Sequence, residues 1–182
     1  MNKKLLLHCC CAPCAIYVVT LLEKDYDLTL FFYNPNIHPE YEYNKRFREL
    51  ENFVDMKKIK LLSGDYDVKN WLGKISGREN DPERGERCKI CYEERLRRTA
   101  EHAKKNNFDF FGTTLTISPH KSALVINYLG LELQDQYGVN FVESDFKKKD
   151  GFKKSLELSR QYDFYRQNYC GCLFSQINNL RK

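Results

Sequence analysis

Glycine and proline are scarce in this sequence, with 9 Gly and 5 Pro among 182 residues. This scarcity excludes a collagen-like chain and a low-complexity linker. Apolar residues make up 42% of the chain and aromatic residues 14%, which excludes intrinsic disorder because a disordered chain has too few apolar residues to form a core. The length predicts a single globular domain over residues 1–182.

A strong excess of one charge is also absent, since 30 Lys and Arg face 25 Asp and Glu. The charges are nevertheless unevenly spread: residues 106–146 hold one basic and five acidic groups, and residues 147–182 hold nine and three. We predict a basic C-terminal helical segment at 147–182. It has the composition of a surface for looped RNA, whose phosphates attract Lys and Arg and whose bases stack on aromatic rings. An ordinary solvated helix face has the same composition.

No small-residue cleavage site follows the apolar stretch 5–22, and His8 and Pro13 interrupt it. These features argue against a signal peptide or a membrane span. We therefore expect a cytoplasmic protein that does not interact with membranes. In that compartment, cysteines are more often metal ligands or redox groups than disulfides.

Short apolar runs alternate with longer amphipathic stretches along the chain. The runs that predict strands are 3–8, 28–34, 59–62, 108–112 and 139–143. The stretches that predict helices are 12–24, 41–57, 88–106, 121–137 and a C-terminal segment from residue 151. The polar stretch 76–87 predicts a surface loop.

This alternation predicts an α/β fold with a doubly wound, parallel, five-stranded sheet and a helical C-terminal segment. Folds of this type bind their ligands at the carboxyl ends of the strands. Residues that directly follow a predicted strand are therefore the first candidates for a functional site.

The eight cysteines fall into three clusters. Cys9, Cys10, Cys11 and Cys14 follow the first predicted strand, where the positive end of the next helix favours thiolates. Cys88 and Cys91 form a C-x-x-C pair at the start of a helix, and Cys170 and Cys172 flank a glycine.

All-thiolate ligation selects soft metals, which means zinc or an iron–sulfur cluster. One zinc ion takes only four thiolates and would leave four unexplained. A redox-active dithiol of the thioredoxin type is a further reading of Cys11 and Cys14.

Five motifs together resemble one family. They are HCCCAPC at 8–14, FYNPNIHPEYEY at 32–43, ERCKICYEERL at 86–96, TTLTISPHK at 113–121 and DFYRQNYCGCLFS at 163–175. The sequence is thereby similar to the QueH family of cobalamin-independent epoxyqueuosine reductases, over nearly the whole chain.

The resemblance implies an oxidoreductase of queuosine biosynthesis, which reduces epoxyqueuosine to queuosine at the wobble position of tRNA. The implied fold is of the PP-loop type, as in tRNA-thiolating enzymes. An S-G-G-x-D-S phosphate loop is missing from the sequence, which argues against use of ATP.

The resemblance also implies an iron-dependent site with a [4Fe–4S] cluster, a tRNA carrying epoxyqueuosine as substrate, and an unidentified electron donor. Cys9 occupies a free position of the family motif. The implied metal ligands are the remaining seven: Cys10, Cys11, Cys14, Cys88, Cys91, Cys170 and Cys172. Since a cubane takes at most four, the other three bind an additional iron ion or form a reducible dithiol.

Removal of the epoxide oxygen also requires proton donors and groups that hold the substrate. From their positions in the motifs, we predict His8, Tyr92 and His120 as catalytic residues. Substrate-binding residues are predicted among the polar and basic side chains Asn34, Asn36, Lys121, Lys153 and Arg166. The candidates for phosphate contacts are Lys147, Lys148, Lys149, Lys153, Lys154, Arg160 and Arg166.

Two other functions stay open on the sequence alone. A zinc-stabilised RNA-binding module without catalysis would be colourless, whereas an iron–sulfur reductase would be brown and bleach in air. A tRNA-thiolating enzyme would require ATP.

Overall fold

Five short strands form one parallel sheet in the computed structural model, which describes residues 3–180 and the side chains up to residue 176. The strands are β1 (Lys3–His8), β2 (Tyr26–Phe32), β3 (Lys60–Ser63), β4 (Phe110–Thr113) and β5 (Asn140–Phe141), in the spatial order β3-β2-β1-β4-β5. Every neighbouring pair is parallel. The predicted fold class is therefore confirmed. Residues 181–182 of the predicted basic segment, and the first two residues, lie outside the described part.

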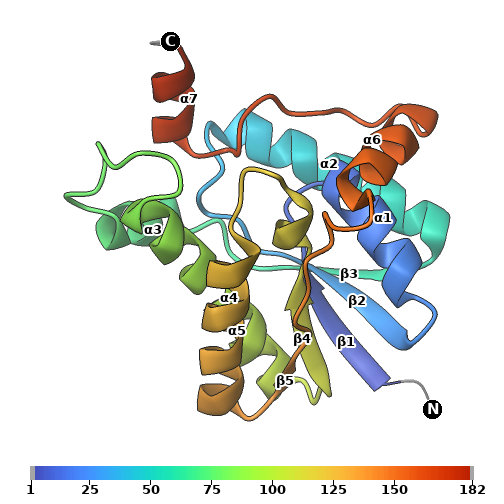
Figure 1. Ribbon diagram of the computed structural model, residues 1–182. Coiled ribbons are helices and arrows are strands. Elements are labelled where there is room, and N and C mark those ends of the chain that lie inside the picture. The colour runs from blue at the N-terminus through green and yellow to red at the C-terminus, as the bar shows by residue number, and fades with distance from the viewer. Residues whose placement is uncertain (1–2, 181–182) are drawn as a thin grey trace.

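Helices cover both faces of this sheet (Figure 1). They are α1 (Ala12–Leu22), α2 (Glu40–Lys57), α3 (Val68–Lys74), α4 (Glu86–Lys105), α5 (Ala123–Tyr137), α6 (Gly151–Gln161) and α7 (Leu173–Leu180), with a 3₁₀ turn η1 at Thr114–Ile117. Strand residues alternate between the faces. Leu5 and Leu7 pack in one core with α1 and α2, and Leu6 packs in the other with α4 and α5.

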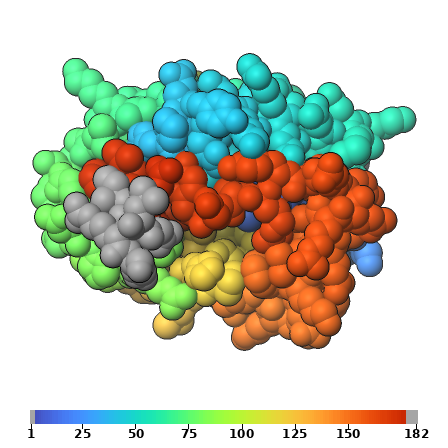
Figure 2. Space-filling model, turned by 90° about the horizontal axis from the view of Figure 1, so that it is seen from above, coloured from blue at the N-terminus to red at the C-terminus, as the bar shows by residue number. Residues whose placement is uncertain are grey.

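The C-terminal part, predicted as a helical segment, forms two separate helices. It consists of α6 and α7, joined by residues 162–172, which we call the crossing segment. Asp163 and Gly171 have φ angles of 52° and 105°, a left-handed conformation that interrupts a helix. Figure 2 shows the crossing segment running between α2 and the residues after β4, beside a recess. It thus lies over the carboxyl edge of the sheet.

The short helix α3 was not predicted, because a helix of seven residues carries little apolar periodicity. Residues 76–85, between α3 and α4, contain neither helix nor strand. None of the described helices combines the length and apolarity that crossing a membrane requires.

Candidate metal centre and adjoining cavity

Three thiols gather where β1 passes into α1. The Sγ atoms of Cys10, Cys11 and Cys14 all lie within 4.8 Å of one another, and those of Cys11 and Cys14 are 2.7 Å apart. Hydrogen bonds from Cys11 and Cys14 lower the pKa of the Cys10 thiol well below its ordinary value. We call these residues the first thiol group, which offers three soft ligands for a metal.

Cys9 points away from this group. Its side chain is fully buried in the core that contains Leu5 and Leu7, and its Sγ lies 3.8 Å from the carbonyl oxygen of Phe31. Burial raises the pKa of the Cys9 thiol well above its ordinary value. Its environment is that of a small apolar core residue.

Four further thiols line a small cavity of about 20 Å³ at the start of α4. Cys88 and Cys91 come from the first turns of that helix. Cys170 and Cys172 come from the end of the crossing segment, just before α7. We call them the second thiol group. Burial raises the pKa of the Cys91 thiol to about 12. All eight cysteines of the chain are free thiols.

Polar atoms without partners surround the second thiol group. Asn36 Oδ1, Trp71 Nε1 and Arg87 Nε are buried and form no hydrogen bond, and all three residues line the same cavity. An unpartnered buried polar group costs about 1–3 kcal/mol. The two donors, Trp71 Nε1 and Arg87 Nε, together with four soft sulfur ligands, fit a bound metal–sulfur group whose sulfur atoms would accept from them.

A buried cation lies between the two thiol groups. Arg95 is 3% exposed and donates from Nε to the carbonyl oxygen of Cys91. Burial opposes its charge, but thiolates at Cys91 and Cys10 raise the pKa of Arg95 above its ordinary value. Its positive charge offsets the negative charge of thiolate ligands.

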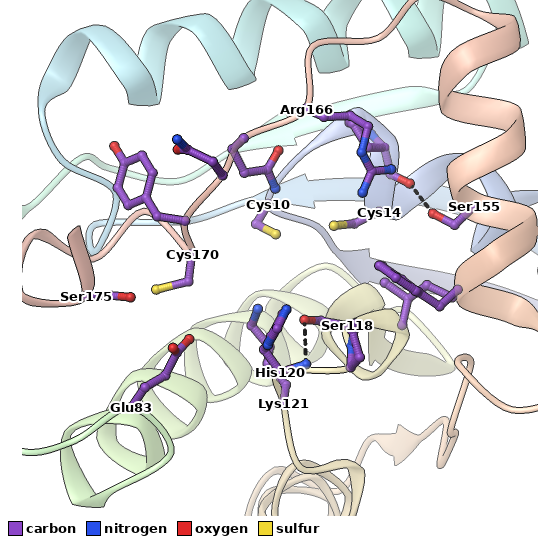
Figure 3. Close-up of a pocket in the computed structure, with 17 residues that line it drawn as sticks. Cys10, Cys14, Glu83, Ser118, His120, Lys121, Ser155, Arg166, Cys170 and Ser175 are labelled. Carbon is purple, nitrogen blue, oxygen red and sulfur yellow. Dashed lines mark hydrogen bonds between the residues drawn. The ribbon is translucent and has the colours of Figure 1, made fainter. Parts of the chain in front are cut away.

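A larger cavity of about 370 Å³ opens beside both groups. Figure 3 shows the sulfur atoms of Cys10, Cys14 and Cys170 around it, with His120 and Lys121 on the opposite wall. Cys170 and Lys121 line both cavities, so the two spaces adjoin. The volume of the larger cavity falls within the range of about 300–1,000 Å³ that is typical of small-molecule sites.

Arg46 holds the crossing segment in place over the sheet. Its guanidinium donates to the carbonyl oxygens of Tyr169 and Cys170, both at 3.2 Å, and forms a buried ion pair with Glu42 at 2.7 Å. A Cβ at Gly171 would lie 2.8 Å from the Ile37 side chain. Gly171 and the buried Arg46 thus allow Cys170 and Cys172 to lie close to the first thiol group.

The structure separates the predicted catalytic residues. His8 is fully buried at the end of β1, where Nδ1 lies 3.0 Å from Thr113 Oγ1 and Nε2 lies 3.2 Å from the Tyr33 carbonyl oxygen. Burial lowers the pKa of His8 to about 4, so the ring is neutral. His120 lines the larger cavity and Tyr92 the smaller one.

The predicted substrate-binding residues are also distributed over several places. Arg166 lines the larger cavity, and Lys121 lines both. Asn36 lines the smaller cavity, whereas Asn34 donates to the Cys9 carbonyl oxygen at 2.9 Å. Lys153 is exposed on α6 and lines neither cavity.

Sequence reasoning missed several residues of this site. They include Trp71, Arg87 and Arg95 around the second thiol group, and Gln167, whose Nε2 lies 3.1 Å from Cys11 Sγ. Trp71 and Gln167 reach the thiols only through the packing of α3 and the crossing segment. Arg95, in contrast, lies one helical turn after Cys91 on α4.

The protein is a doubly wound α/β domain that carries two thiol groups at the carboxyl edge of its sheet. This arrangement is suited to a metal-dependent reaction. The particular family of the protein follows from comparison with known proteins. The family model "Epoxyqueuosine reductase QueH" matches residues 5–178, and this chain belongs to that family.

Curated relatives support this membership. A protein from Streptococcus pyogenes serotype M1, named epoxyqueuosine reductase QueH, is 40% identical over 96% of this chain and 71% of its own length. Proteins of the same name from Acinetobacter baylyi and Thermotoga maritima are 41% and 34% identical, over 94% and 97% of this chain and 80% and 92% of their own lengths.

Two solved structures share the fold. The U34-tRNA thiolase NcsA from Methanococcus maripaludis, with its [4Fe–4S] cluster, has a TM-score of 0.59 at 16% identity, over 99% of this chain and 67% of that one. A predicted subunit of tRNA methyltransferase from Methanocaldococcus jannaschii has a TM-score of 0.53 at 13% identity, over 84% and 75%.

Proposed function

We propose that this protein reduces epoxyqueuosine to queuosine at the wobble position of tRNA. The observation that carries the proposal is the convergence of six cysteines, from three distant segments of a QueH-family chain, on two adjoining cavities, with Cys11 beside Cys10 and Cys14. The reaction cleaves both C–O bonds of the epoxide and forms a C=C bond. It takes up two electrons and two protons and releases one water molecule.

An iron–sulfur centre is the cofactor that this donor set supports. The second thiol group offers four thiolates, the number that a [4Fe–4S] cluster takes. The first thiol group offers three and leaves a ligand position open, which suits an additional iron ion. When bound, such centres supply electrons and Lewis acidity. A reducible dithiol of Cys11 and Cys14 is the alternative use of the first group.

The larger cavity is the proposed place for the modified base. Lys121 and Arg166 supply donors for its hydroxyl groups or a nearby phosphate. Asn36 offers an unpartnered acceptor from the adjoining space. Thiolates and the Arg95 guanidinium place several charges beside this cavity. The crossing segment lies over these charged groups and limits the access of water to them.

His120 and Tyr92 are the proposed proton donors. His120 lines the cavity that would hold the base, and the Tyr92 hydroxyl belongs to the wall of the second thiol group. His8 also stays a predicted catalytic residue. Its two hydrogen bonds favour a positioning role, in which it fixes the ends of β1 and β4 beneath the first thiol group.

The tRNA would approach over the crossing segment and α6, with the protein acting in the cytoplasm and drawing electrons from a separate donor. The exposed basic side chains Lys153 on α6 and Lys148 just before it would contact phosphates.

The decisive experiment is anaerobic incubation of the purified protein with epoxyqueuosine-containing tRNA and a chemical reductant, followed by mass spectrometry of the nucleosides. We expect the loss of one oxygen mass. An unchanged nucleoside mass from iron-loaded protein would refute the function. A gain of sulfur mass in the presence of ATP would instead indicate tRNA thiolation, the activity named for the structural neighbour.

Iron counting on the same preparation tests the cofactor. More than four irons per chain support an additional iron ion, and four irons with a titratable dithiol support the alternative. Colourless protein that contains zinc and no iron would indicate the RNA-binding module.

A further inference from the structure

Trp71 is the only tryptophan of the chain and lies beside the second thiol group. It belongs to α3, is 1% exposed, and packs in a small apolar cluster with Ile75 and Cys91. A tryptophan in this position brings a hydrogen-bond donor as well as apolar surface.

The indole N–H has no partner in its surroundings. Trp71 Nε1 is shielded from solvent and forms no hydrogen bond with the described residues. An indole nitrogen only donates, so its partner must be an acceptor. Buried polar groups in native proteins are paired in the great majority of cases.

The cavity beside the indole is the place for that acceptor. Trp71 lines it together with Cys88, Cys91, Cys170 and Cys172. The carbonyl oxygen of the Asn36 side chain lines the same cavity and is unpartnered too, so it does not accept from the indole. A negatively charged sulfur of a bound iron–sulfur group would satisfy the N–H, because sulfide and thiolate accept hydrogen bonds from nearby donors.

We propose that Trp71 is a positioning residue that donates its indole N–H to a sulfur of the iron centre held by the second thiol group and raises the reduction potential of that centre. This inference rests on the proposed cofactor. Reduction adds one negative charge to the centre. A donor that is hydrogen-bonded to its sulfur stabilises the reduced state more than the oxidised state.

The test replaces the N–H while keeping the ring. One variant is Trp71→Phe. The second is the whole protein with benzothienylalanine at position 71, whose ring has the shape of indole but carries sulfur in place of N–H. Because Trp71 is the single tryptophan, growth of a tryptophan auxotroph on the analogue labels this site alone. The control is Ile75→Val, which perturbs the same apolar cluster without changing a donor.

The measurement is an anaerobic redox titration of the iron-loaded proteins. We expect both replacements to lower the one-electron reduction equilibrium constant about tenfold, or about 59 mV, with iron content equal to the parent's and the Ile75→Val potential unchanged. The analogue keeps the test decisive if Trp71→Phe fails to fold, since its shape is that of tryptophan.

Three outcomes would overturn the inference. An iron-loaded analogue protein whose potential equals the parent's would show that the N–H does not reach the centre. An equal shift in Ile75→Val would assign the effect to packing. Absence of iron from the parent protein itself would overturn the proposed cofactor and this inference together, so the two failures are distinguishable.

Discussion

Cys9 and Cys10 are neighbours in the chain, but their side chains lie in different apolar cores, on opposite sides of the sheet. Cys9 is enclosed by the core around Leu5 and Leu7, whereas Cys10 lines the larger cavity and belongs to the first thiol group. The two positions therefore form a matched pair for mutation. A change at one removes apolar volume, and a change at the other removes a ligand.

We expect Cys10→Ala to lower the reductase rate at least about 100-fold, because the loss of a metal ligand exceeds the 10- to 100-fold cost of losing a supporting contact. Cys9→Ala should keep iron and activity, with a modest loss of stability from the small cavity it leaves. Iron content and single-turnover rates measure both effects. Equal losses in the two variants would contradict the assignment of Cys10 as a ligand.

His120 is the residue whose position most favours proton transfer. Its side chain lines the larger cavity, while the Arg84 guanidinium anchors its backbone by donating to the carbonyl oxygens of His120 and Pro119 at 3.1 and 3.0 Å. A proton donor that is lost from a reaction of this kind costs about 10²- to 10⁴-fold in rate.

His120→Gln should therefore lower kcat about 100-fold while iron content and tRNA affinity stay at the parent's values. Tyr92→Phe is the companion variant for the second candidate donor. Rates under saturating tRNA decide between them. A full rate in His120→Gln with a large loss in Tyr92→Phe would transfer the donor role to Tyr92.

At the scale of elements, a buried carboxylate joins α3 to α4. Glu94 of α4 accepts hydrogen bonds from Lys74 of α3, from Arg97, and from the Tyr33 hydroxyl at 3.0 Å. Burial alone would raise the pKa of Glu94, but the bonds from Lys74 and Arg97 lower it below its ordinary value. The contact keeps α3, and with it Trp71, against the second thiol group.

Glu94→Gln should reduce the free energy of unfolding by about 1–2 kcal/mol at pH 7, since it weakens charge-assisted bonds to two half-exposed cations. A carboxyl whose folded pKa is depressed stabilises the protein above its unfolded pKa of about 4.3 and loses that effect as pH falls through the folded value. The difference between parent and variant should therefore shrink below about pH 4.

Urea unfolding followed by circular dichroism measures this difference. Glu101→Gln is the control, because Glu101 lies on the same helix and pairs with Arg97 and Arg98 at the surface. Its effect should stay within about 0.5 kcal/mol. A Glu94→Gln difference that is constant down to pH 3 would show that the carboxylate charge is not the stabilising feature.

The elements that the sequence predicted best are those with the most apolar sequence. β1 was predicted with its observed bounds, 3–8, because four consecutive buried residues end it. β5 was predicted at 139–143 but pairs only over Asn140–Phe141, because it lies at the sheet edge and its pairing depends on β4 alone. α5 begins at Ala123, two residues later than predicted, because Ser122 caps it by accepting from Val125 N–H.

The part of the site that could be predicted from the sequence is the set of clustered cysteines. The strand–helix alternation predicted the first cysteine cluster at the end of β1, and the spacing within the other two clusters marked them as further candidate ligands. The contact of Trp71 with those thiols could not be predicted in the same way, because Trp71 reaches them only through the packing of α3 against α4. Its role depends on tertiary contacts that leave no local pattern.

At the scale of the whole molecule, one edge of the sheet collects nearly all features of interest. The thiol groups, the larger cavity and the crossing segment lie there, and α6 flanks them (Figures 1 and 2). The last 36 residues, which form α6, the crossing segment and α7, hold nine basic and three acidic groups. A polyanion that reaches the cavity therefore passes the most basic part of the chain.

Phosphate contacts on this surface should make tRNA binding strongly dependent on salt. Each contact contributes about 0.7–0.9 to the slope of log K against log salt concentration. We expect Lys148→Gln and Lys153→Gln each to flatten the slope by about that amount if the RNA extends along α6, since Lys153 is exposed on α6 and Lys148 is exposed just before it. Lys105→Gln is the control, because Lys105 ends α4, which runs back to the opposite edge of the sheet.

Fluorescence anisotropy with a labelled anticodon stem-loop RNA, titrated at several salt concentrations, measures these slopes. The control should reproduce the parent's slope, because a lysine far from the bound RNA releases no counterions. Equal slopes for all four proteins would mean that Lys148 and Lys153 are solvated charges. The RNA would then have to be held by the cavity itself, through Lys121 and Arg166, whose substitution would become the next test.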